Sequence, residues 1–292
     1  MSTDPEMRVP VAAVVLLDPP VLFEFRGPDA VRYLNGQLTQ DVRLVAGGKV
    51  SLPSCVTDAK GRLQFRVWIT EAADGGLWVE GPPDSAEALE ARLTRYLIAD
   101  EVEVVDLSGR YRLLHVMDSD AVPPEGVIAR KSHRFGVEGS DWWVPVGAEC
   151  ALPAGAVHLA SEELEDFRIR HGVPQWGKEL TAGLLPPEAG LDTSDISYEK
   201  GCYIGQEVIS RIKFAGKLNK RLVRISIDPS WPLEGLRLVD ADGREAGEIT
   251  SISPLARDGA RAALAYVKRG VDAPIVTAPD GRSCAVRQSV NS

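Results

Sequence analysis

The sequence predicts an α+β protein of two or three packed units, with a small β-barrel at its carboxyl end. Its 292 residues exceed what one hydrophobic core of ordinary size holds. Up to Arg221, stretches with helical spacing of apolar residues alternate with strand-like stretches. Beyond Arg221 there are evenly spaced strand patterns and no helical ones, and closing such strands into a barrel would protect their edges.

Composition narrows the class of protein further. Apolar residues make up 44% and charged residues 26% of the chain, which is typical of globular proteins. The four cysteines have neither the spacing of a disulfide framework nor that of a zinc site, so reduced thiols are expected. A net charge of -9 argues against general affinity for nucleic acids, and we expect no direct nucleic-acid binding.

The first apolar stretch, residues 9–17, bears on where the protein resides. It ends at Asp18, well short of a membrane span, and it follows Asp4 and Glu6 rather than a cationic segment. We therefore expect no signal peptide, no membrane association and a location in the cytosol or an organelle matrix, of which we take the cytoplasm as the prediction.

Local patterns predict the elements in order. A short helix opens at Gly27-Pro28-Asp29, runs through Leu34 and stops at Asn35-Gly36. A second helix is predicted over 85–97, its apolar stripe Leu89, Leu93, Tyr96 and Leu97 covering a sheet. Strands are predicted at 50–56, 63–70, 77–80, 102–107 and 111–117, the last two joined as a hairpin by Ser108-Gly109.

Residues 118–160 give weak signals, and the pattern then becomes clear again. A helix with Ser161 as N-cap ends near His171, and another spans 206–212. The final strands are predicted at 222–227, 236–239, 246–252, 262–267, 275–277 and 284–286, with tight turns at Asp242-Gly243 and Asp280-Gly281.

The strongest functional signal is Cys202, in the run KGCYIGQE that spans Lys200 to Glu207. Gly201 and Gly205 allow a sharp turn or a close approach of the backbone. The positive end of the helix that follows, together with Lys200, would increase the thiolate fraction of Cys202. A reactive or metal-ligating thiol is one interpretation, and an inert buried thiol is the alternative.

Two further patterns concern the partners of Cys202. None of the four histidines, His115, His133, His158 and His171, is selected by its position as a catalytic base. The cysteines Cys55, Cys150 and Cys284 lack cluster spacing, so no stable metal site is expected and Cys202 would hold an iron-sulfur cluster only transiently, with a partner or a second copy.

Residues 199–221 form a local basic segment in an acidic protein. The segment contains six cations and only two acids, Glu199 and Glu207. The cations are Lys200, Arg211, Lys213, Lys217, Lys220 and Arg221. Either this is an ordinary solvated surface, or it seats an anionic ligand.

The run KGCYIGQEVISR resembles the signature of the YgfZ family of folate-binding proteins, which is related to the T-protein (GcvT, aminomethyltransferase) of the glycine cleavage system. Supporting motifs occur in the expected order: GPDAVRYLNGQLTQDV (27–42), TDAKGRL (57–63), FRIRHGVPQWGKEL (167–180), PPEAGL (186–191) and AGEITSISPL (246–255). The resemblance spans almost the whole chain and thins between about 115 and 160.

The resemblance implies a three-lobed GcvT/YgfZ-like fold around a central folate channel. On this basis we expect an N-terminal lobe with the folate-binding core (1–108), a second α+β lobe (109–160), a return to the core that carries the cysteine motif (161–220) and a C-terminal β-barrel (221–292). It also implies assistance in the assembly or repair of iron-sulfur clusters in a subset of enzymes, including tRNA-modifying ones, with assembly proteins or client enzymes as partners.

The same resemblance assigns roles to residues. Cys202 is the functional residue, and Lys200, Gly201, Tyr203, Gly205, Gln206 and Glu207 shape its loop. Tetrahydrofolate or a derivative is the expected cofactor, with no permanent metal. Its rings need aromatic or aliphatic walls and its glutamate tail needs cations. The expected folate contacts are Gln37, Trp68, Arg168, Arg170 and Tyr203.

The sequence departs from the T-protein at its acids. Gln64 and Phe65 stand where the T-protein carries adjacent aspartates, and Arg170 stands in place of a second acid. A folate-linked aminomethyl transfer needs a carboxylate to steer protons. We therefore expect no conventional enzyme; the alternative is a tetrahydrofolate-dependent aminomethyltransferase or one-carbon transferase.

Overall fold

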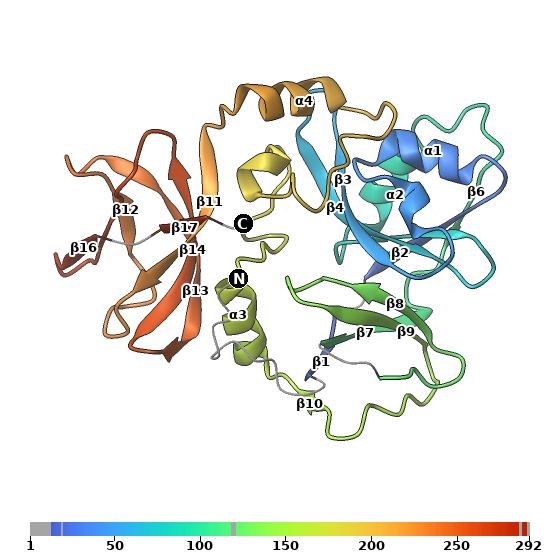
Figure 1. The fold of residues 1–292 in the computed structure, drawn as a ribbon, viewed down its shortest axis with the longest axis horizontal. Coiled ribbons are helices and arrows are strands. Elements are labelled where there is room, and N and C mark those ends of the chain that lie inside the picture. The colour runs from blue at the N-terminus through green and yellow to red at the C-terminus, as the bar shows by residue number, and fades with distance from the viewer. Residues whose placement is uncertain (1–12, 19, 118–120, 286–287, 291–292) are drawn as a thin grey trace. The chain divides into compact units, whose positions relative to one another are not determined.

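The computed structural model of the protein describes residues 13–18, 20–117, 121–285 and 288–290 (Figure 1). The chain divides into two compact units: residues 1–56 with 65–159, and residues 57–64 with 160–292. The second unit thus includes residues 57–64, the tip of the hairpin formed by β3 (Ser51–Thr57) and β4 (Leu63–Glu71), whereas most of these two strands belong to the first unit. The predicted division into four segments remains a prediction.

The first unit contains two sheets. One has the strand order β3-β4-β5-β2-β6, with β2 (Val21–Arg26), β3 (Ser51–Thr57), β4 (Leu63–Glu71), β5 (Leu77–Gly81) and β6 (Glu103–Asp106). The other has the order β10-β1-β7-β9-β8, with β1 (Ala13–Leu16), β7 (Tyr111–Met117), β8 (Ile128–Ser132), β9 (Gly139–Pro145) and β10 (Val157–His158).

Helices α1 (Ala30–Gln37) and α2 (Ala86–Thr94) and the 3₁₀ turn η2 (Val42–Val45) complete the first unit. Leu34, Leu89 and Leu93 are fully buried in one core with Phe23 and Phe25 of β2, so α2 covers the sheet as predicted. A second core brings Trp78 of β5 against Trp143 of β9, with ring centroids 5.6 Å apart. Apolar burial therefore joins the two sheets of this unit.

The second unit combines short helices with one antiparallel sheet. The helices are α3 (Ser161–Arg170), η3 (Pro186–Ala189) and α4 (Gln206–Ala215). The sheet has the order β16-β15-β12-β13-β14-β11-β17, with β11 (Lys220–Ile227), β12 (Arg237–Val239), β13 (Glu245–Arg257), β14 (Ala260–Lys268), β15 (Ile275–Thr277), β16 (Ser283–Ala285) and β17 (Gln288–Val290). No pairing joins β16 to β17 in the described residues, so the predicted barrel is observed as a half-barrel.

Several local predictions are wrong at their boundaries. The first helix does not stop at Asn35-Gly36, because Gly36 is helical and the Asn35 side chain instead accepts a hydrogen bond from the Val42 N–H. The second helix ends at Thr94, which leaves Tyr96 47% exposed beyond it. The N-cap of α3 is Ala160 rather than Ser161.

The predicted hairpin at Ser108-Gly109 is also wrong. β6 pairs with β2, whereas β7 pairs with β1 and β9, so the turn carries the chain from one sheet to the other. The hydroxyl of Ser108 accepts a hydrogen bond from the Leu22 N–H across this change of sheet. The unassigned region 118–160 contains β8, β9 and β10.

Two predictions extend beyond the described residues. Of the apolar stretch 9–17, residues 13–16 form β1 and residues 9–12 lie outside the described part, as do Asp4 and Glu6. Of the predicted last strand, 283–285 form β16, and Val286 lies outside. In the described part of the chain, no helix has the length and apolarity needed to cross a bilayer.

Candidate functional site

Cys202 lies on an exposed loop that leads directly into α4. The N-cap of this helix is Gly205, and the Gln206 N–H bonds to the Tyr203 carbonyl, which closes the turn between loop and helix. The prediction that the cysteine motif precedes a helix N-terminus is therefore confirmed.

Gly205 is the point at which this loop meets the β3–β4 hairpin tip. Its φ of +90° lies in the left-handed region, and a Cβ built on it would stand 2.5 Å from the Asp58 carbonyl oxygen and 2.8 Å from the Thr57 hydroxyl. The Thr57 hydroxyl donates a 2.6 Å hydrogen bond to the Ile204 carbonyl. Only glycine fits both the backbone conformation and the contact.

The hairpin tip, residues 57–63, is itself held rigid. The Asp58 carboxylate accepts hydrogen bonds from the backbone N–H groups of Lys60 and Arg62. The Arg62 guanidinium donates to the Gly183 carbonyl, and Leu63 exchanges backbone bonds with Gly183 and Leu184. The motif TDAKGRL therefore provides the platform for the cysteine loop, a role that local patterns alone did not assign.

A small core fixes the loop from its inner side. Tyr203 and Ile196 are buried together with Ile209 of α4. The side chain of Lys200 is only 6% exposed, and its ammonium lies 5.3 Å from the Tyr203 ring centroid. Lys200 thus turns inward and stabilises the loop, while Cys202 remains on the outside.

The remaining motif residues contribute to the surface. Gly201 is exposed, and a Cβ added there would meet no atom within 4 Å. Glu207 forms a 2.7 Å ion pair with Arg211 one helical turn further on, and both side chains are more than 70% exposed. Such a pair contributes little to stability.

The other cysteines differ in environment. Cys55 is buried, and burial raises the pKa of the partly covered Cys150 thiol. Cys284 is exposed like Cys202 but lies on the edge strand β16. Within the described residues, no three His, Cys, Asp or Glu side chains gather as a metal site.

The predicted folate contacts of the first unit already have partners. The Gln37 side-chain oxygen accepts a 2.9 Å bond from Arg92. Trp68 is 7% exposed, and the Arg134 guanidinium stacks 4.2 Å from its ring centroid. One face of this aromatic ring is therefore covered by an arginine.

Arg134 belongs to a buried ionic network that the sequence did not reveal. Its guanidinium donates to both oxygens of Glu80 and to both oxygens of Asp141, at 2.6–3.1 Å. The Nδ1 atom of His115 lies 2.7 Å from Asp141. Because Glu80 is on β5 and Asp141 on β9, the network links the two sheets of the first unit.

The predicted folate contacts of the second unit are also engaged. Arg168 uses all five of its N–H donors, on Glu165, Glu179, Ser251 and the Val173 carbonyl. Arg170 donates to Asp166 at 2.9 Å. The bonds of Arg168 anchor α3 to its own unit, so Arg168 would have to give some of them up to bind the tail of folate. In the described residues the Nη2 atom of Arg170 is buried and has no hydrogen-bond partner. The folate contacts remain predictions.

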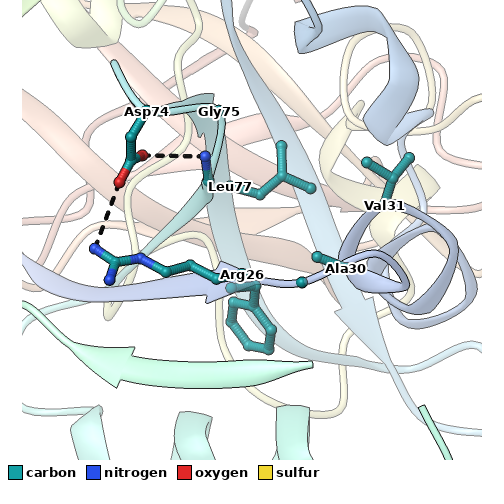
Figure 2. Close-up of a pocket in the computed structure, with 9 residues that line it drawn as sticks. Arg26, Ala30, Val31, Asp74, Gly75 and Leu77 are labelled. Carbon is teal, nitrogen blue, oxygen red and sulfur yellow. Dashed lines mark hydrogen bonds and ion pairs between the residues drawn. The ribbon is translucent and has the colours of Figure 1, made fainter. Parts of the chain in front are cut away.

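A pocket of about 210 Å³ occurs in the first unit between β2, α1 and the β4–β5 turn (Figure 2). Arg26 lies 3.6 Å from Asp74 on one side, and Leu77, Ala30 and Val31 form the other. Its lining includes none of the predicted site residues. The pocket therefore adds no group to the cysteine site.

Comparison with solved structures defines the class of fold. The chain matches glycine cleavage system aminomethyltransferase T from Bartonella henselae with a TM-score of 0.76, over 97% of this chain and 85% of that one, at 17% sequence identity. The protein thus has a GcvT-like α+β fold.

Sequence comparison identifies the relatives. No protein-family profile matches the chain. A mitochondrial iron-sulfur cluster assembly factor IBA57 homolog of Cryptococcus neoformans is 23% identical, over 71% of this chain and 64% of its own length. A putative chloroplastic transferase of Arabidopsis thaliana is 34% identical, over 83% of this chain and 62% of its own. An uncharacterized protein of Haemophilus influenzae is 27% identical over 79% and 80%.

The chain is a homologue of the IBA57 proteins and has a GcvT-like fold, which confirms its resemblance to the YgfZ family. It spans 62–64% of the length of the first two of these relatives.

Proposed function

We propose that the protein assists the assembly or repair of iron-sulfur clusters in a subset of enzymes, including tRNA-modifying ones, through Cys202. The observation that carries the proposal is an exposed thiol on a loop that is itself rigidly held by Gly205, Thr57 and the Tyr203 core. The relatives named as iron-sulfur cluster assembly factors support the class of activity.

In this proposal Cys202 undergoes ligand exchange at an iron atom of a partner's cluster. The thiol loses its proton to solvent, its sulfur binds iron, and the ligand that leaves iron takes up a proton. No net electron transfer is needed. A rigid loop keeps the sulfur exposed without the cost of ordering a mobile segment for each encounter.

We expect Cys202→Ala to reduce the activity of dependent iron-sulfur enzymes to the level of a strain that lacks the protein. The substitution removes the only sulfur atom of the loop and leaves its packing intact. Activities of an iron-sulfur dehydratase and of a cluster-dependent tRNA-modifying enzyme are measured in the deletion strain carrying each variant.

Cys284→Ala is the matched control, because Cys284 is also an exposed free thiol. It should restore the activities fully. Full restoration by Cys202→Ala would overturn the proposed role of this thiol.

The second part of the proposal is that the protein binds tetrahydrofolate or a derivative. Its support is the GcvT-like fold and the resemblance of the motifs. Most of the residues predicted to hold folate already have partners: Gln37 bonds Arg92, Arg168 bonds Glu179, and Arg170 bonds Asp166 through Nε, although its Nη2 atom has no hydrogen-bond partner among the described residues. No chemical step is therefore assigned to folate.

Anaerobic calorimetric titration with tetrahydrofolate is expected to give saturable binding with the same Kd for the wild type and Cys202→Ala. The equality follows because the role of the thiol is exchange at iron, not contact with folate. Absence of heat with the wild type would remove folate from the proposal and leave the thiol chemistry standing.

The alternative is a tetrahydrofolate-dependent aminomethyltransferase, which the GcvT-like fold favours. Against it, Gln64 stands where an acid is expected, and Arg170 is paired with Asp166. Formation of methylenetetrahydrofolate from an aminomethylated lipoyl carrier would establish this alternative.

A further inference from the structure

Helix α4 leaves most of its apolar residues unburied. It contains five of them in ten residues, yet only Ile209 is buried. Val208 lies against Gly61 of the hairpin tip, but Phe214 is 89% exposed and Ala215 is exposed as well. Helices of this length are marginal alone and usually gain stability by packing an apolar face.

Exposed cations lie on α4 and in the segment that follows it. Arg211, Lys213 and Lys217 are exposed, as is Arg221 at the start of β11, against exposed Glu199 and Glu207. The Lys213 ammonium lies 3.4 Å from the Tyr198 ring centroid, so one cation is fixed between the helix and the cysteine loop. The protein as a whole carries a net charge of -9, so this local excess of cations is complementary to an acidic partner.

The same small core connects α4 with Cys202. Ile209 of the helix packs against Tyr203, the residue that follows Cys202, and the partly buried Tyr198 also packs against this core. Phe214 stands eight residues beyond Gln206, about 12 Å along the helix axis. A partner seated on the helix would therefore be held in a fixed position relative to the thiol.

We propose that the exposed C-terminal part of α4 and the segment that follows it, which carry Phe214, Arg211, Lys213 and Lys217, dock an acidic iron-sulfur protein and present its cluster to Cys202. The inference rests on the proposed function and names the class of its partner. An exposed aromatic residue with an exposed arginine and two exposed lysines within three positions of it has the composition of an interface centre, where aromatic residues and arginine carry most of the binding energy.

A purified [4Fe–4S] ferredoxin with an acidic surface serves as the probe, and its Kd for the protein is measured by calorimetry. Phe214→Ala and the double charge reversal Arg211→Glu with Lys217→Glu should each weaken binding by about tenfold or more. The wild-type Kd should rise about tenfold between about 0.03 M and 0.3 M salt, since ions screen the charges.

Matched controls come from the first unit. Ile98 is also 89% exposed, but the nearby residues Asp100 and Glu101 are acidic, so Ile98→Ala should leave the Kd unchanged. Lys49→Glu with Lys131→Glu changes the net charge by the same amount as the double variant at Arg211 and Lys217, at two exposed lysines of the first unit, and should also have little effect.

No binding by the wild type, or equal weakening by the controls, would overturn the proposal. Binding of a transfer RNA in place of the ferredoxin, with the same dependence on Arg211 and Lys217, would also overturn it and indicate a nucleic-acid surface.

Client-enzyme activities in the deletion strain distinguish the docking surface from the proposed function of Cys202, on which the docking proposal rests. The α4 variants should regain client activity when overproduced, because mass action compensates for weak docking, whereas Cys202→Ala should not. Normal activity of the α4 variants at ordinary levels would overturn the docking surface alone. Normal activity of Cys202→Ala would overturn the proposed function.

Discussion

Arg134→Met is expected to lower the free energy of unfolding by about 3–5 kcal/mol. The Arg134 side chain is 9% exposed and is the hydrogen-bond partner of two carboxylates, Glu80 and Asp141, whose side chains are 10% and 0% exposed. Removing the guanidinium leaves both charges buried without their cation. Urea unfolding followed by tryptophan fluorescence measures the loss, since Trp68, Trp78 and Trp143 all lie in this unit.

The control is an ion pair of the same type on the surface. Arg282 bonds Asp280 at 2.8 Å, but the side chains are 45% and 52% exposed, so Arg282→Met should cost less than about 1 kcal/mol. Adding Glu80→Gln and Asp141→Asn to Arg134→Met should recover part of the loss, because the uncompensated charges disappear. A loss below about 1 kcal/mol for Arg134→Met would contradict the prediction.

The network also sets the direction of a pH dependence. Burial alone would raise the pKa of Asp141, but Arg134 and His115 outweigh it and hold this pKa far below its ordinary value. The stability contributed by the Asp141 carboxylate is thus present above the unfolded-state pKa and is lost as the pH falls below it. Without Arg134 this protection is weakened, so acid unfolding of Arg134→Met should begin at a higher pH than that of the wild type.

Gly205→Ala is expected to lower the free energy of unfolding by about 2–4 kcal/mol and to abolish client-enzyme activity. The new Cβ would clash with the Asp58 carbonyl oxygen at 2.5 Å, in a backbone region that alanine disfavours. Relief of this clash requires the loop to leave the hairpin tip and break the Thr57–Ile204 bond. Calorimetric unfolding and hydrogen exchange of the Ile204 to Ile209 amides measure the effect.

Gly201→Ala is the matched control within the same motif. The added Cβ meets no atom within 4 Å, and Gly201 is not among the residues with positive φ. This variant should remain within about 0.5 kcal/mol of the wild type and should keep client activity. If Gly201→Ala and Gly205→Ala behaved alike, the close approach at Gly205 would not be what holds the loop.

Local sequence determined much of this protein. The helix after Cys202, the covering of a sheet by Leu89 and Leu93, and the turns at Asp242-Gly243 and Asp280-Gly281 were all predicted from spacing and turn chemistry. These features depend on residues within a few positions of one another, so a single stretch of chain contains the information. The cysteine motif was recognisable for the same reason.

Tertiary structure decided the features that join distant residues. Asn35 and Gly36 continue helix α1, and the Asn35 side chain accepts a hydrogen bond from the Val42 N–H. Ser108-Gly109 connects two different sheets, because β6 pairs with β2 whereas β7 pairs with β9. Arg134 lies in a stretch of weak patterns, and its role in the buried ionic network depends on Glu80, which is 54 residues away.

The cysteine loop also depends on distant contacts. Lys200 turns inward onto Tyr203, and position 205 must be glycine because the carbonyl of Asp58 lies against it. Such contacts depend on where separate strands and loops meet, which no local pattern specifies.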